Sequence, residues 1–239
     1  RLKFKTKLLH QLILFMNINS LKPADQLAQK FGVKALVYGP PGTGKTPVFN
    51  TAPRPVLLVV EPGMLSMRDS NIPSFEAYTA PAVDEFFLWF FQSAEAKNFD
   101  TLGIDSVSQL AEIILTNELK INKDGRKAYG EMSRKVMENI NKLYFFPNKH
   151  LYLIAKQTSI EEGGSLKRRP YFPGQDLNVK IPHLFDEILH LGMHSVPGMP
   201  GYTKAFCTAE QFDLLARDRS GRLAAYEPPN LTNLFNVFV

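Results

Sequence analysis

The sequence is poor in cysteine, and this limits both its chemistry and its setting. Cys207 is the single cysteine among 239 residues, so no disulfide can form within the chain. A disulfide framework is typical of small secreted domains, and its absence favours the reducing cytoplasm. We therefore expect a cytoplasmic protein whose cysteine contributes to packing rather than to chemistry.

Metal-ligand and nucleophile motifs are scarce as well. Of the five histidines only His190 and His194 have H-x-x-x-H spacing, and none pairs with a cysteine at a spacing that would suit a transition metal. No G-x-S-x-G nucleophile elbow occurs in the chain. These absences argue against a dedicated transition-metal site and against a hydrolase built on that elbow.

The chain also lacks an apolar run long enough to span a bilayer, so we expect no membrane partner. The strongest candidate, residues 8–16, is short and is interrupted by polar residues. Its apolar side chains recur at helical spacing, which predicts a short helix that docks on this or a neighbouring subunit. Alternatively, the residues upstream of Met16 precede the native protein. Residues 1–20 are thus expected to be an N-terminal extension and 21–239 one domain.

The composition permits a large core and favours an anionic partner. Hydrophobic residues make up 44% of the chain, and no repeat, low-complexity tract or long linker interrupts it. The 28 Lys and Arg residues exceed the 23 Asp and Glu residues, which gives a net charge of +5. A basic balance of this size favours an anionic partner without identifying it.

A glycine-rich motif is the most specific feature that is present. Residues Gly39 to Thr46 read G-P-P-G-T-G-K-T and directly follow the apolar run Ala35 to Tyr38. In such a loop the glycines let backbone N–H groups wrap phosphates, Lys45 reaches the β- and γ-phosphates, and the Thr46 hydroxyl ligates Mg²⁺. The predicted nucleotide-binding residues are Gly39, Pro40, Pro41, Gly42, Thr43, Gly44, Lys45, Thr46 and Pro47.

Short apolar runs alternate with helical patterns, which predicts an α/β fold with a mainly parallel sheet flanked by helices. Strands are expected at Lys34–Tyr38, Pro55–Val60, Thr101–Asp105 and His150–Ala155. Helices are expected at Val83–Ala96, Ser106–Leu119 and Tyr129–Tyr144. Shorter runs near the C-terminus predict antiparallel strands at one sheet edge: Phe185–Met193, Lys204–Thr208, Leu214–Ala216 and Leu223–Tyr226.

Two carboxylates are predicted at the edge of this sheet. Asp105 ends a short strand, which would place it beside the phosphate loop as the second Mg²⁺-orienting group with Thr46. No Glu follows Asp105, so the general base must come from elsewhere. Glu61 ends the neighbouring strand, and parallel strands end at the same edge. We therefore predict that Glu61 activates the attacking water.

Three further polar residues are candidates for catalysis. Gln157 ends the next apolar strand and is a candidate for a hydrogen bond to the γ-phosphate or to water, although a surface glutamine reads the same way. Arg217 and Arg219 are two residues apart, so on a strand they point to the same side and suit a paired clamp on an anion. If that face meets a neighbouring subunit, they become fingers supplied in trans. A solvated basic turn is the alternative.

Two segments rich in charge and glycine are predicted to be mobile loops. The first, residues 120–127, contains Lys123, Arg126 and Lys127. The second, residues 158–172, combines Lys167, Arg168 and Arg169 with the aromatic side chains of Tyr171 and Phe172. Cations mixed with aromatics are typical of surfaces that bind single-stranded nucleic acid. Loops are ordinarily polar, however, so composition alone leaves nucleic-acid binding open.

The order of these elements resembles the RecA-like ATPase core, and more narrowly the phage RecA-like P-loop ATPases of the single-strand annealing recombinase type. The resemblance covers roughly Leu21 to Leu234. It depends on Val33–Thr46, Pro55–Glu61, Ile104–Ser106, Gly125–Glu131 and Ala216–Gly221, the last similar to the A-K-x-R-x-G finger signature with Arg217 replacing the lysine.

The resemblance assigns a role to each candidate. It implies that ATP and Mg²⁺ are the cofactors, Glu61 the catalytic glutamate, Gln157 the γ-phosphate sensor, and Arg217 and Arg219 the trans-acting fingers. The two basic segments become the DNA-contacting loops. Pro47 departs from the family, which usually has Thr or Ser there, and it removes a backbone N–H near the α-phosphate. Slow hydrolysis is therefore expected.

The leading hypothesis from the sequence is a Mg²⁺-dependent ATPase that forms homo-oligomers on single-stranded DNA and promotes annealing or strand exchange in phage recombination. A single-strand-binding protein is a candidate partner, and the host cytoplasm is the expected location. The alternative is a nucleotide-gated assembly or loader protein with little turnover. A small-molecule kinase fits less well, because no arginine-rich lid over a second substrate is evident.

Overall fold

The computed structural model describes residues 21–29 and 31–238, and it divides into two units, residues 1–30 and residues 31–239. In the first unit α2 (Ala24–Gln29) is a six-residue helix with Asp25 in its first turn, where the partial positive charge of a helix N-terminus favours a carboxylate. The expected N-terminal extension, residues 1–20, lies outside the described residues. All other elements belong to the second unit.

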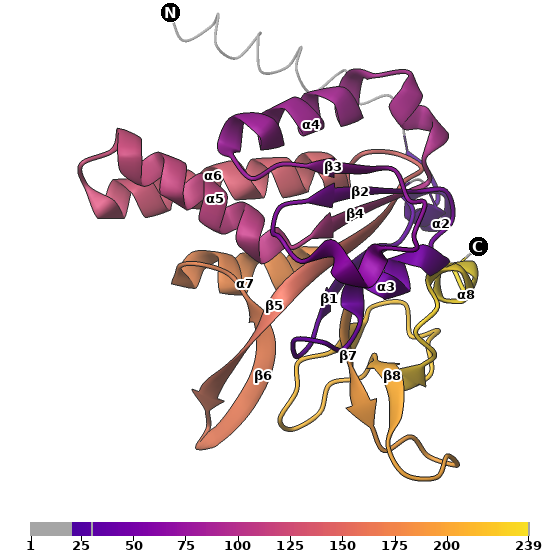
Figure 1. Ribbon diagram of the computed structural model, residues 1–239. Helices are drawn as coiled ribbons and strands as arrows, with labels where there is room; N and C mark the ends of the chain where they lie inside the picture. Colours follow the sequence, from indigo (N-terminus) through magenta and orange to yellow (C-terminus); the bar gives the residue numbers. More distant parts are fainter. Residues whose placement is uncertain (1–20, 30, 239) are drawn as a thin grey trace, which may run out of the picture. The chain divides into compact units, whose positions relative to one another are not determined.

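Ten strands of the described residues form one mixed sheet (Figure 1). Its main path runs β3 (Ser74–Glu76), β2 (Pro55–Val59), β4 (Thr101–Asp105), β5 (His150–Glu162), β1 (Lys34–Tyr38), β7 (Glu187–His194), β8 (Thr203–Cys207) and β10 (Tyr226–Glu227). The strands from β3 to β7 are parallel, whereas β8 and β10 are antiparallel to their neighbours. Off this path, β6 (Ser165–Tyr171) pairs with β5, and β9 (Arg217–Asp218) pairs with β7.

The central strands are apolar throughout because both faces of the sheet are covered. In β1, Leu36 packs into one buried cluster and Val37 into the other, and both side chains are fully buried. The first cluster is closed by α4 (Ala80–Gln92), α5 (Val107–Ile121), α6 (Gly125–Tyr144) and α7 (Gln175–Leu184). The second is closed by α3 (Lys45–Val48) and α8 (Leu231–Asn236). The predicted α/β class, with a mainly parallel sheet flanked by helices and antiparallel strands near the C-terminus, is confirmed.

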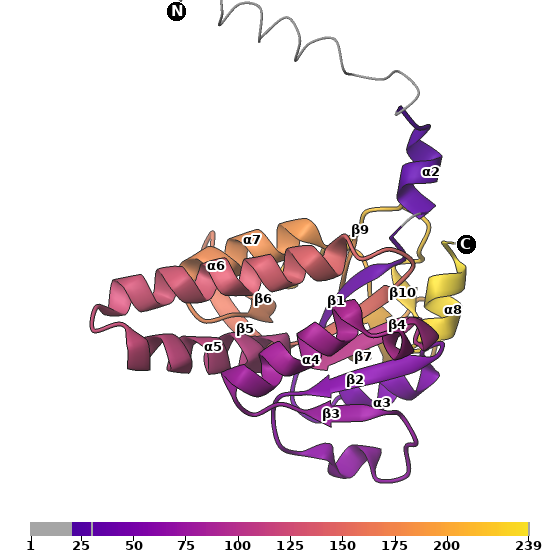
Figure 2. The ribbon, with the colours of Figure 1, turned by 90° about the horizontal axis from the view of Figure 1, so that it is seen from above.

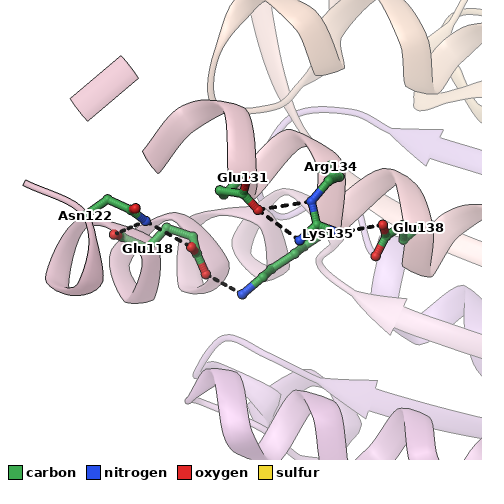
Figure 3. A network of polar contacts seen from close by, with 6 residues as sticks. All are labelled: Glu118, Asn122, Glu131, Arg134, Lys135 and Glu138. Atoms are coloured by element: carbon green, nitrogen blue, oxygen red, sulfur yellow. Dashed lines mark hydrogen bonds and ion pairs between the residues drawn. The ribbon is translucent and has the colours of Figure 1, made fainter. Parts of the chain in front are cut away.

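A polar network joins α5 to α6, which run side by side in Figure 2 and are shown from close by in Figure 3. Lys135 Nζ of α6 lies 2.6 Å from Glu118 Oε1 of α5, and the Glu118 side chain is only 4% exposed. The bond from Lys135 lowers the pKa of Glu118. Along α6, Arg134 bonds Glu131 at 2.9 Å and Glu138 at 2.6 Å, pairs that stabilise a helix through spacings of three and four residues. The Glu118–Lys135 ion pair therefore joins α5 to α6, while the Arg134 pairs stabilise α6 itself.

Residues 158–172 are not a mobile loop, and that prediction is wrong. Strand β5 continues to Glu162 and pairs with β6 from Lys156–Tyr171 to Glu162–Ser165. Gly163 and Gly164 make the tight turn between them with φ angles of +60° and +81°, a conformation that glycine adopts without steric cost. The charged side chains of the segment are typical of a loop and led to the wrong prediction. The two adjacent glycines are instead the turn of a β-hairpin.

Other boundaries differ from the prediction by smaller amounts. The loop expected at 120–127 shrinks to residues 122–124, because α5 ends at Ile121 and the Asp124 side chain caps α6. Helix α4 begins before the predicted Val83, since the Thr79 side chain caps it. Of the short C-terminal runs, β7 and β8 are confirmed, 214–216 is not a strand, and 223–226 contributes only its last residue to β10. No helix in the described part of the chain is both long and apolar enough to cross a membrane.

Candidate functional site

The glycine-rich motif forms a tight loop between β1 and α3. Gly42 and Gly44 have φ angles of +77° and +83°, which L side chains rarely adopt. A Cβ atom on Gly39 would lie 2.2 Å from the Leu191 carbonyl oxygen, so the loop begins in direct contact with β7. Glycine is therefore required at these positions for different reasons, conformation at two of them and close packing at the other.

Lys45, the first residue of α3, is folded back onto this loop. Its Nζ donates to the carbonyl oxygens of Gly39 at 2.7 Å and Pro40 at 2.9 Å. Burial lowers the pKa of Lys45, while the charges of Asp105 and Glu61 act in the opposite direction. The ammonium group thus lies at the loop with two carboxylates in its electrostatic surroundings, where it can exchange the carbonyls for phosphate oxygens.

Thr46 and Asp105 are brought together, although they are 59 positions apart in the sequence. Thr46 Oγ1 donates to Asp105 Oδ2 at 2.5 Å. Asp105 ends β4, which pairs in parallel with β2 and β5, so its carboxylate emerges at the edge of the sheet beside the loop. Burial raises the pKa of Asp105, and the bond from Thr46 opposes that effect.

The donor set at this contact fits Mg²⁺. A hydroxyl and a carboxylate oxygen are the hard ligands that this ion prefers, and one or two carboxylates usually hold it together with substrate phosphates. Thr46 and Asp105 would hold the ion in that way, as the sequence predicts. When bound, it neutralises the charge that develops on the transferred phosphoryl group.

Glu61 follows the end of β2, next to Asp105. Val59 pairs with Asp105, and the Val60 N–H donates to the Asp105 carbonyl oxygen at 2.9 Å, which brings the two carboxylates to the same edge. Glu61 Oε2 lies 3.7 Å from Lys156 Nζ. The sequence reasoning missed Lys156, whose only signal is its position directly before Gln157.

Lys156 also connects this carboxylate to α5. Its Nζ donates to Gln109 Oε1 at 2.6 Å and forms an ion pair with Glu112 at 3.2 Å. Because Lys156 lies at the root of the β5–β6 hairpin, one ammonium group joins the hairpin, the helix and the proposed general base.

Gln157 contacts His190, which in turn contacts His194, and the sequence reasoning assigned neither histidine to the site. His190 Nε2 lies 3.0 Å from Gln157 Oε1, and His190 Nδ1 lies 3.1 Å from His194 Nε2. Burial lowers the pKa of His190 to about 3, so its ring is neutral near pH 7. A Cβ on Gly192 would lie 2.7 Å from His190 Cε1 and 3.4 Å from His194 Nε2. The missing side chain of Gly192 is what lets the two rings meet.

Arg217 and Arg219 point to the same segment of their own chain. Arg217 Nη2 donates to the carbonyl oxygens of Pro182 and Phe185, both at 2.6 Å. Arg219 Nη2 donates to the His183 carbonyl at 2.7 Å, and its Nη1 lies 3.3 Å from Asp186 Oδ1. Only Arg217 lies on the strand β9, and Arg219 follows it. The paired clamp on an anion and the role in trans both stay predictions.

The first basic cluster lies at the turn that joins α5 to α6. Lys123 is in the turn, Arg126 and Lys127 are in the first helical turn of α6, and all three are exposed. The second cluster lies on β6 and is only partly exposed. There Lys167 pairs with Glu210, Arg168 with Asp213 and Arg169 with Glu162.

One family of known proteins matches the stretch of the chain that contains this site. A protein-family model described as an AAA domain matches residues 32–220, a stretch that includes the phosphate loop, Glu61, Asp105 and Gln157. No curated protein matches the chain. Among solved structures, a KaiC-like protein from the hyperthermophilic archaeon Pyrococcus horikoshii is similar at 16% identity and a TM-score of 0.44, over 73% of this chain and 77% of that one. The family match extends over most of the sequence, and the chain belongs to the AAA domain family of P-loop ATPases.

Proposed function

We propose that the chain is a Mg²⁺-dependent ATPase of the RecA-like recombinase type, which forms homo-oligomers on single-stranded DNA and promotes annealing or strand exchange in phage recombination. The main support for ATP hydrolysis is the 2.5 Å hydrogen bond from Thr46 Oγ1 to Asp105 Oδ2, which lies beside the phosphate loop. It brings together the two oxygen ligands that a Mg²⁺-nucleotide requires.

The residues around this contact have separate tasks in hydrolysis. Lys45 supplies positive charge to the phosphates. Glu61 takes a proton from the water that attacks the γ-phosphorus, and the bond to the leaving ADP oxygen breaks as the new P–O bond forms. Gln157 donates from its amide nitrogen toward the γ-phosphate, since His190 engages its oxygen. Pro47 has no backbone N–H to offer the α-phosphate, which supports a slow reaction.

Two basic surfaces support the DNA-binding part of the proposal. The α5–α6 turn carries Lys123, Arg126 and Lys127 on its exposed side. The β5–β6 hairpin carries Lys167, Arg168 and Arg169, whose carboxylate partners would be exchanged for DNA phosphates. Lys156 joins this hairpin to Glu61, so binding of DNA to the hairpin would change the electrostatic surroundings of the proposed general base. A single-strand-binding protein and the host cytoplasm complete the proposal as partner and location.

The test measures ATP turnover and filter binding with and without single-stranded DNA. We expect DNA to stimulate turnover, and we expect affinity for DNA to fall with salt. Replacing Lys167, Arg168 and Arg169 together by alanine should lower the log–log salt slope by roughly two to three units. Replacing Lys123, Arg126 and Lys127 is the matched experiment on the other surface. If DNA does not change ATP turnover and the protein retains no DNA on filters, the recombinase proposal is contradicted. The proposal of ATPase activity then still stands.

A nucleotide-gated assembly or loader protein is the second candidate. Arg217 and Arg219 are engaged within their own chain, so a single subunit does not present free fingers. Together with Pro47 this favours ATP binding with little turnover. Nucleotide-dependent assembly without DNA-stimulated hydrolysis would support this candidate over the first.

A further inference from the structure

The β7–β8 hairpin is built directly against the phosphate loop. Tyr38 at the end of β1 pairs with His190 of β7, and the next residue, Gly39, packs on the Leu191 carbonyl. In turn β8 pairs with β7 in the register that sets Lys204 opposite Met193. Figure 1 shows β8 beside β7. A side chain on β8 is therefore within reach of the loop.

Lys204 points toward the face of the sheet that carries the loop. It alternates with Ala205 and shares a face with Phe206, which packs in the same buried cluster as Val48 and Phe49, the residues that follow the loop. A Cβ atom built on Gly44 would lie 2.6 Å from Lys204 Nζ and 3.6 Å from its Cε. The end of the Lys204 side chain thus lies on the phosphate loop.

The Lys204 ammonium has no anionic partner in the described part of the chain. It makes no hydrogen bond or ion pair with any described residue and is exposed to solvent. Other lysines near the sheet edge are engaged: Lys45 bonds loop carbonyls, and Lys156 is paired with carboxylates. A free cation at a loop whose N–H groups face phosphates is placed to bind the same anion.

We propose that Lys204 is a second phosphate-binding lysine, which contacts the β- or γ-phosphate of the bound nucleoside triphosphate from β8 of the same chain. This inference rests on the proposed ATP binding and adds a residue outside the phosphate-loop motif. The same hairpin carries His190, which contacts Gln157, and His194, which contacts His190. One β-hairpin would therefore contact the nucleotide phosphates through Lys204 and position the proposed γ-phosphate sensor through His190.

The test compares Lys204→Met with wild type by measuring the affinity for ATP, ADP and AMP at fixed salt. Losing a charge-assisted contact should weaken ATP binding about 10-fold or more, with a smaller loss for AMP. Lys204→Arg should restore most of the affinity for ATP. Lys142→Met, at an exposed lysine in the last turn of α6, is the matched control and should bind like wild type.

A second measurement does not depend on any variant. An amine-reactive reagent should label Lys204 in the free protein, and Mg²⁺-ATP should protect Lys204 and Lys45 but not Lys142. Wild-type affinity in Lys204→Met, equal losses for ATP and AMP, or no protection of Lys204 would overturn the inference. If the wild type and Lys45→Ala bind ATP equally poorly, it is the proposed function itself that fails.

Discussion

His190 Nε2 donates to Gln157 Oε1 across 3.0 Å, and this contact leaves the amide nitrogen of Gln157 as its free end. A neutral imidazole has one donor and one acceptor nitrogen. Since Nε2 donates, Nδ1 accepts from His194 Nε2 at 3.1 Å. The amide oxygen of Gln157 is thereby occupied, and its two N–H donors remain for the proposed contact with the γ-phosphate. The histidines are positioning residues that act through Gln157.

Gly192→Ala tests this arrangement. The new methyl group would lie 2.7 Å from His190 Cε1, so the His190–His194 contact must open and Gln157 loses its support. We expect turnover of ATP to fall about 10-fold while ATP affinity changes little, because the phosphate loop is untouched. The matched control is Gly130→Ala, since a Cβ on Gly130 meets nothing within 4 Å. Wild-type turnover in Gly192→Ala would show that Gln157 needs no support from the histidines.

Glu187 makes the stability of the fold depend on pH. It is fully buried on β7, and neither carboxylate oxygen has a hydrogen-bond partner among the described residues. Burial, reinforced by the charges of Asp218 and Asp186 against that of Arg217, raises the pKa of Glu187 from 4.5 to about 8. The folded protein keeps a proton that the unfolded chain releases, so the free energy of unfolding falls as the pH rises from 4.5 to about 8.

Glu187→Gln removes this dependence, because the amide stays neutral at every pH. The variant should therefore melt at a higher temperature than wild type at about pH 8, and the difference should shrink or reverse at about pH 5. Thermal denaturation at the two pH values measures it. Glu85→Gln, on the exposed side of α4, should show no such dependence. An equal difference at both pH values would mean that Glu187 ionises in the folded protein as it does in the unfolded chain.

The proposed finger role of Arg219 predicts rescue between subunits. Arg219→Ala should spare nucleotide binding yet lower turnover, and mixing it with Lys45→Ala should restore some activity. The first subunit keeps an intact phosphate loop and the second donates an intact arginine. Arg222→Ala, a nearby exposed arginine, is the control and should turn over ATP like wild type. If mixed oligomers recover nothing, the contacts of Arg219 with His183 and Asp186 are its whole role.

The parallel strands were predictable from the sequence because burial on both faces leaves a clear signal. The runs at Lys34–Tyr38 and Thr101–Asp105 match β1 and β4 at both ends. The β5–β6 hairpin was not predictable in the same way, since its exposed, charged residues carry no apolar alternation and resemble a loop. Helix α7 was missed because it is short and contains Pro182, which ordinarily marks the end of a helix.

The residues of the candidate site differ in the same way in how well the sequence predicts their positions. The phosphate loop is a local motif, and Asp105 and Glu61 end strands whose edge the parallel pairing dictates, so all three were found from the sequence. Strand pairing between segments distant in the sequence brings four further residues to the site: His190, His194, Lys156 and Lys204. Their positions depend on the strand register, which no short motif in the chain reveals.

Steady-state ATP turnover of Glu61→Gln, measured together with its ATP affinity, tests whether Glu61 is the general base of a Mg²⁺-dependent ATPase. We predict that the variant binds ATP like wild type, because Lys45, Thr46 and Asp105 are intact, and that its turnover falls about 10²-fold or more. Lys45→Ala, which should lose ATP binding, verifies that the turnover measured belongs to this site. Full turnover in Glu61→Gln, with loss of turnover but retained binding in Asp105→Asn, would contradict the account and assign the base to Asp105.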